Sequence, residues 1–99
     1  MAWATGEYTN APTSNEVRPA GATSTAVYCG GASLIADAVA AGAQIFDGDP
    51  SGSGVLKYTL KCETANDTAN WQPEGPVLFP NGLFLQVQGN GAVCYLLYK

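Results

Sequence analysis

The residues with the clearest potential for chemistry are two aspartates, Asp47 and Asp49, in the stretch FDGDPSGSG. Carboxylates two residues apart in a Gly/Ser-rich loop could hold calcium, which takes roughly six to eight oxygen ligands. The loop lacks the bidentate glutamate of the helix–loop–helix calcium motif. Asp-Gly, Pro50 and the glycines are instead typical of a tight turn. We predict a turn between two strands and no metal site.

The other polar groups do not form a known catalytic pattern. A carboxylate pair such as Asp47 and Glu63 could serve as acid and base, but nothing in the spacing selects it. The chain has no histidine to shuttle protons near neutral pH. It also lacks the GxSxG, phosphate-loop and HExxH motifs. We expect a protein that is not an enzyme and that uses no cofactor.

The three cysteines, Cys29, Cys62 and Cys94, are odd in number and far apart. A disulfide framework normally has an even count, and zinc sites need CxxC pairs or histidine. Unpaired cysteine is among the most buried residue types. The sequence therefore predicts three buried thiols.

Length and composition restrict the function classes. A chain of 99 residues fits one domain, and its charged fraction of 12% is about half the usual ~25%. Its four basic residues are scattered, which disfavours nucleic-acid binding, and no apolar run approaches the ~20 residues of a membrane span. The N-terminus does not resemble a signal peptide, so we expect synthesis in a cytoplasm. So few charges suggest a surface covered by other chains, or else a neutral Ser/Thr/Asn surface.

From residue 22 onward, short apolar runs separated by Gly, Pro, Asn and Asp indicate β-strands. Val55–Cys62 alternates and predicts a half-buried strand, with Leu56, Tyr58, Leu60 and Cys62 on its inner side. Gly89-Asn90-Gly91 predicts a hairpin turn after the alternating run 83–88. Ala92–Tyr98 is apolar on both sides, which is typical of a central strand or a subunit interface.

The segment Ser33–Ala43 is ambiguous. Ser33 could cap a helix, alanine favours one, and Gly42 could end it. Because the neighbouring elements are all strands, we favour two strands of a meander with a turn near Ala40–Gly42.

Residues 1–21 are rich in Ala, Thr, Asn, Gly and Pro, with Trp3, Tyr8 and Val17 as isolated anchors. Such a segment cannot build a core, so it is either an arm that orders on a neighbouring surface or a floppy terminus. The expected fold is all-β: a small antiparallel β-sandwich or jelly-roll-like barrel over residues 22–99, with residues 1–21 as an extended arm.

The aromatic residues allow two interpretations. Trp3, Trp71, Tyr8, Phe84 and Tyr98 could form a sugar-binding platform, although such residues are more often core or interface anchors. Trp71 lies in the predicted loop TANDTANWQPEGP, where it could pin the loop or contact a partner.

The order of motifs from about Thr23 to Tyr98 resembles that of small all-β virion proteins of tailed bacteriophages, several of which decorate or cement the capsid. The resemblance rests on the strand end Phe46-Asp47-Gly48, on the run Phe79-Pro80-Asn81-Gly82-Leu83 and on a closing V-x-Y. It implies a protein that binds between capsomers, often at local three-fold or two-fold axes, and that has no catalytic residues.

The leading hypothesis is therefore a capsid decoration protein on the outer capsid surface. It is expected to be a homo-oligomer, with a trimer favoured, and to bind the major capsid protein, with no nucleic acid or membrane involved. The expected partner-binding residues are Trp3, Tyr8, Val17, Arg18, Trp71 and Tyr98. Deleting residues 1–21 is expected to abolish binding and leave the domain folded. The alternatives are a receptor- or glycan-binding module of a head or tail fibre, and a structural module unrelated to phage.

Overall fold

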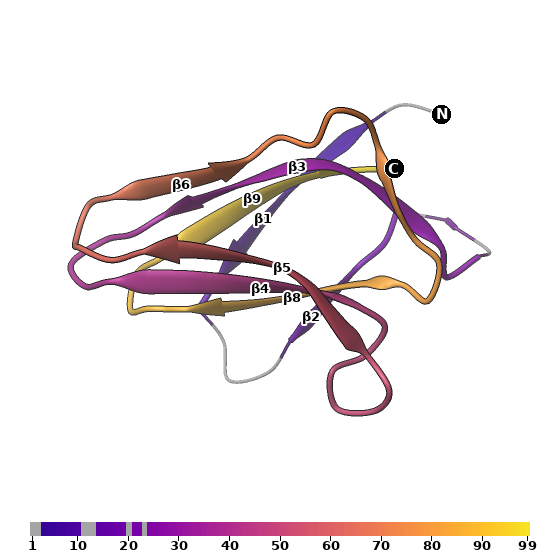
Figure 1. The fold of residues 1–99 in the computed structure, drawn as a ribbon, viewed down its shortest axis with the longest axis horizontal. Coiled ribbons are helices and arrows are strands. Elements are labelled where there is room, and N and C mark those ends of the chain that lie inside the picture. Colours follow the sequence, from indigo (N-terminus) through magenta and orange to yellow (C-terminus); the bar gives the residue numbers. More distant parts are fainter. Residues whose placement is uncertain (1–2, 11–13, 20, 23) are drawn as a thin grey trace.

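The computed structural model describes residues 3–10, 14–19, 21–22 and 24–99. This part of the chain forms nine strands: β1 (Ala4–Thr9), β2 (Asn15–Val17), β3 (Val27–Ile35), β4 (Ala41–Asp47), β5 (Val55–Cys62), β6 (Thr68–Trp71), β7 (Val77–Phe79), β8 (Leu83–Gln88) and β9 (Val93–Tyr98). The described residues include no helix that could cross a membrane. Two antiparallel sheets pack face to face (Figure 1), which confirms the predicted all-β sandwich.

Sheet A has the strand order β1-β9-β3-β6, with β7 also paired to β3, and sheet B has the order β2-β8-β4-β5. Alternating residues of each strand point into the space between the sheets. Leu34 and Leu96 of sheet A and Ile45 and Leu85 of sheet B are fully buried there. The alternation predicted for residues 83–88 is confirmed, because β8 buries Leu83, Leu85 and Val87.

The predicted hairpin at Gly89-Asn90-Gly91 is wrong. β8 lies in sheet B and β9 in sheet A, so the turn carries the chain across the core. Both strands bury alternating apolar residues in the core between the sheets, and they share no strand pairing. Gly89 and Gly91 have φ of 114° and 79°, which glycine adopts readily. The turn chemistry was therefore recognised, but the sheet assignment was not.

The segment Ser33–Ala43 forms the end of one strand, a bend and the start of the next strand. This confirms the preference for strands over a helix. The predicted meander is wrong, because β3 lies in sheet A and β4 in sheet B. The bend spans residues 36–40, slightly before the predicted Ala40–Gly42 turn. Among successive strands, only β4 and β5 are hydrogen-bonded neighbours, so FDGDPSGSG closes the single hairpin of the described chain.

β5 is only partly the half-buried strand that was predicted. Leu60 and Cys62 are buried, but Leu56 and Tyr58 are 47% and 37% exposed. β5 is the edge strand of sheet B, and a register shift between Ile45 and Phe46 moves Leu56 to the outer side. β9, in contrast, lies between β1 and β3, so the prediction of a central strand is confirmed.

The described residues of the segment 1–21 lie on the sandwich. β1 pairs with β9 and β2 pairs with β8, so the segment supplies an edge strand to each sheet. Val17 is completely buried in the core. Deleting residues 1–21 would therefore remove an edge strand from each sheet. A loss of binding in this deletion variant could not be distinguished from a loss of the fold. Residues 1–2, 11–13 and 20 of this segment lie outside the described residues.

Candidate interaction surface

The two aspartates of FDGDPSGSG have separate structural roles. Asp49 is exposed, and its Oδ1 accepts hydrogen bonds from the backbone N–H and the hydroxyl of Ser51, at 2.9 and 2.8 Å. These two bonds lower the pKa of the Asp49 carboxyl. The Asp49 carbonyl oxygen also accepts bonds from the N–H groups of Gly52 and Gly54. Asp49 thus closes the hairpin by local hydrogen bonding, as a turn residue does.

Asp47 is nearly buried and fastens the hairpin to a distant segment. Its Oδ1 accepts a hydrogen bond from the Asn81 backbone N–H at 2.9 Å, and its Oδ2 accepts one from the Asn81 side-chain amide at 3.3 Å. The Gly48 N–H donates to the Gly82 carbonyl at 2.8 Å. The motifs FDG and PNGL, on which the phage resemblance rests, therefore form one structural clasp between β4 and the start of β8.

The three thiols are buried and form no disulfide, as predicted. Burial raises the pKa of Cys29 and of Cys62. Burial, followed by the neighbouring thiols Cys29 and Cys62, raises the pKa of Cys94 to about 12. All three are therefore protonated and unreactive at neutral pH. Across the described residues, no group of three or more Cys, Asp or Glu side chains is placed to hold a metal ion.

The predicted contact residues do not share one surface. Val17 is a core residue, which leaves no surface for a partner. Arg18 is exposed and forms an ion pair of 3.3 Å with Glu16, beside strand β2. Tyr8 and Tyr98 lie on the inner side of sheet A, partly buried against the core.

Tyr8 and Tyr98 stabilise the edge of sheet A. Burial, then the charge of Tyr98 and a hydrogen bond to its side chain, raise the pKa of Tyr8 to about 12. A Cβ placed on Gly6 would lie 2.6 Å from the Tyr8 ring, so the missing side chain leaves room for the tyrosine. These contacts fix β1 against β9, and both tyrosines are only partly exposed.

Trp71 is in strand β6 and not in a loop. Its ring stacks on Tyr58, with the ring centroids 4.6 Å apart and the planes at 18°. Because β5 and β6 are the edge strands of sheets B and A, this pair joins the two sheets at one side of the sandwich. The sugar-binding platform, which was the less favoured interpretation of the five aromatic residues, is consequently not assembled.

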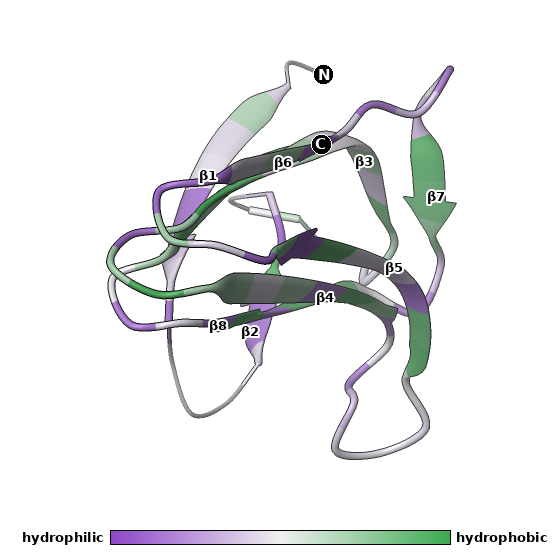
Figure 2. Cartoon of the chain, turned by 60° about the vertical axis from the view of Figure 1, so that its left-hand side comes forward, coloured by the Kyte–Doolittle hydropathy of each residue, from purple (hydrophilic) through white to green (hydrophobic). Residues whose placement is uncertain are grey.

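The outer side of sheet A carries the main group of exposed apolar residues, which we name the apolar face. Its exposed large side chains are Trp3, Tyr28, Ile35, Leu78 and Leu97, each between 37% and 46% exposed. Strand pairing places Tyr28 opposite both Leu78 and Lys99, whereas Ile35 lies at the other end of β3, opposite Val93. Figure 2 shows the hydrophobic character of β7, at one end of this face.

Trp3 is the one predicted contact residue on the apolar face. Its ring packs beside Gly30, where a Cβ would lie 3.1 Å from Cζ3. The Lys99 Nζ lies 4.7 Å from the ring centroid, in cation–π geometry. Tyr28, Ile35, Leu78 and Leu97 were not predicted. These residues alternate along their strands with buried residues and therefore point away from the core. That pattern can be recognised only when the strand register is known.

No protein-family model, curated protein or solved structure matches this chain. The function of the protein is therefore inferred from its own surface and from the motifs described above.

Proposed function

We propose that this protein is a non-enzymatic virion structural protein of a tailed bacteriophage that decorates the mature capsid. It binds the major capsid protein between neighbouring capsomers, on the outer surface of the shell, as a trimer. By binding the expanded lattice and not its precursor, it stabilises the expanded lattice by mass action.

The apolar face is the observation that carries this proposal. Five large apolar side chains are exposed on one side of sheet A, and the strands there bring few charges with them. An exposed apolar patch such as that of Tyr28 and Leu78 is typical of a protein interaction site. Trp and Tyr are also the residue types that most often dominate interface energies. The second support is the order of motifs from about Thr23 to Tyr98, which resembles that of small all-β virion proteins of tailed bacteriophages.

The test is co-sedimentation of the purified chain with empty shells of the phage that encodes it, in expanded and unexpanded form. We expect saturable binding to expanded shells only, together with a higher melting temperature of the shells. Binding to neither form would contradict the proposal.

A matched pair of variants tests whether the apolar face is the surface that binds the shell. Leu78→Asp changes an apolar-face leucine that is 46% exposed, and Leu56→Asp changes a leucine of sheet B that is 47% exposed. We expect Leu78→Asp to weaken shell binding by about tenfold or more, because the interface would desolvate a carboxylate. Leu56→Asp should bind as the unchanged protein does. Equal loss in both variants would show that binding does not use the apolar face.

A further inference from the structure

Gly42 is the second residue of β4, an interior strand of sheet B. Glycine weakens a strand interior and often marks a place where a ligand approaches the backbone closely. Other glycines here have steric reasons: a Cβ on Gly89 would lie 2.8 Å from the Ala40 carbonyl oxygen, at a φ of 114°. A Cβ on Gly42 would meet only the Leu60 carbonyl oxygen, at 3.8 Å, an ordinary contact. The fold therefore does not require glycine at this position.

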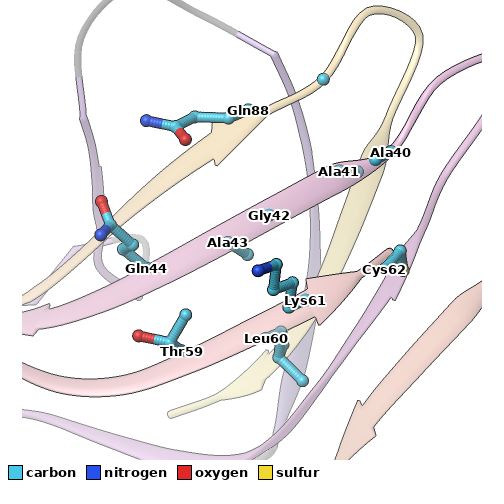
Figure 3. Close-up of a pocket in the computed structure, with 11 residues that line it drawn as sticks. Ala40, Ala41, Gly42, Ala43, Gln44, Thr59, Leu60, Lys61, Cys62 and Gln88 are labelled. Atoms are coloured by element: carbon cyan, nitrogen blue, oxygen red, sulfur yellow. The ribbon is translucent and has the colours of Figure 1, made fainter. Parts of the chain in front are cut away.

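The missing side chain leaves a hollow of about 280 Å³ on the outer side of sheet B. Gly42 pairs with Gln88 of β8 and with Lys61 of β5, and the next row along the strands is Gln86, Gln44 and Thr59. We name these six residues the amide face. Figure 3 shows the side chains of Gln44, Thr59, Lys61 and Gln88 around the hollow, with Lys61 directed toward β4.

Apart from the ammonium group of Lys61, the amide face is uncharged, and it is rich in both donors and acceptors. Each glutamine amide carries two N–H donors and one carbonyl acceptor. Among the hydrogen bonds between described residues, none engages the side chains of Gln44, Gln86 or Gln88. The following row holds Phe46 and Phe84, which pair with each other and offer flat apolar surface beside the amides.

We propose that the amide face binds a neutral oligosaccharide. Sugar hydroxyls are paired donors and acceptors that match glutamine amides and the Thr59 hydroxyl, and a sugar ring has an apolar side that suits Phe46 and Phe84. Lys61 supplies one further donor to a hydroxyl. The open backbone at Gly42 admits the sugar ring to the floor of the hollow. This site is separate from the apolar face and does not depend on the capsid proposal.

The experiment is an NMR titration that follows the side-chain amide signals of the three glutamines. The probes are neutral hexasaccharides of glucose, mannose and galactose, and a hexasaccharide of uronic acid as the charged comparison, all at millimolar concentration. We expect saturable shifts with at least one neutral probe. Shifts with none of the neutral probes, or with the uronic acid probe alone, would overturn the proposal.

Two variants and a control locate the site. Gly42→Val fills the hollow, and Gln44→Leu removes one amide at similar size; each should weaken binding by about tenfold or more. Gly42→Val should melt at the same temperature as the unchanged protein or higher, because valine favours a strand. Gly75→Val, in a loop position with open space around it, is the control and should bind normally. Unchanged affinity in Gly42→Val would exclude the hollow as the binding site.

Discussion

Sheets A and B have similar inner sides and different outer sides. Inside, both present alternating small and medium-sized apolar residues, such as Ala32 and Leu34 in β3 and Ala43 and Ile45 in β4. Outside, sheet A exposes large apolar side chains, whereas sheet B presents glutamines around a glycine, together with Phe46, Phe84 and the exposed Leu56. A sandwich requires only that the inner sides be apolar. The difference between the outer sides is therefore not imposed by the fold, and it carries the functional information.

The same comparison separates the two proposals. A broad apolar surface suits a protein partner, because its burial removes a large area from water. A small polar hollow suits a ligand held by hydrogen bonds. The two surfaces lie on opposite sides of the sandwich, so the protein could engage a protein partner and a sugar at the same time.

The two sheets also differ in the titratable groups that they bury. The loss of stability at alkaline pH should be the largest of the effects predicted here. Cys94 and Tyr8 of sheet A both have a pKa of about 12, against ordinary values of 9.0 and 10.0. Because the folded-state values are raised, their stabilising contribution is complete below the ordinary values and is lost as the pH rises toward 12. For Cys94 the loss between pH 9 and 12 should reach about 4 kcal/mol. The partly exposed Tyr8 should add less, between pH 10 and 12.

Urea unfolding at a series of pH values would measure this loss. For each protein, the free energy of unfolding at a given pH is compared with that of the same protein at pH 7. Between pH 9 and 12 this free energy should fall much less in Cys94→Ala than in the unchanged protein. An equally steep curve in the variant would show that Cys94 is not the group responsible.

The hairpin clasp gives the next largest effect and compares two neighbouring aspartates. Asp47→Ala should lower the free energy of unfolding by about 2 kcal/mol, because the Asn81 N–H and side-chain amide lose their partner. Asp49→Ala removes only local bonds of an exposed loop and should have a much smaller effect. Thermal or urea unfolding of both variants would test this. A larger loss for Asp49→Ala would contradict the assignment of the clasp.

The sequence was sufficient to predict most strands from residue 22 onward, the buried thiols and the tight turn, because each depends on local pattern. It did not predict β1 and β2 in residues 1–21, or β6 in the segment expected to be a loop. Alternation in residues 83–88 indicates which side chains are buried, and that is what the structure shows. Alternation does not indicate which strand lies alongside. The hairpin at Gly89–Gly91 and the meander at Ser33–Ala43 were wrong for this reason. The same limit applied to β5, whose position at the edge of sheet B leaves Leu56 and Tyr58 exposed.

The candidate surface was less predictable than the fold. Large aromatic residues fill cores as well as they anchor interfaces, so sequence alone could not separate Tyr8, on the inner side, from Trp3, on the outer side. Gly42 was interpreted only as a helix end or as part of a turn, because the role of a glycine within a strand depends on the space around it. Only the register of β4 with β5 and β8 reveals that its missing side chain opens a hollow.

The Tyr58–Trp71 stack should give the smallest effect, and it tests how the two sheets are joined. The rings are 4.6 Å apart and belong to edge strands of different sheets. A double-mutant cycle with Tyr58→Ala and Trp71→Ala should give a coupling energy of about 1 kcal/mol, which is usual for an aromatic pair. A second cycle that combines Tyr58→Ala with Trp3→Ala is the control. Trp3 packs on Gly30 and Lys99 instead, so its coupling to Tyr58 should be close to zero. Equal coupling in both cycles would mean that the sandwich responds as a whole, and that the stack does not join the sheets at this edge.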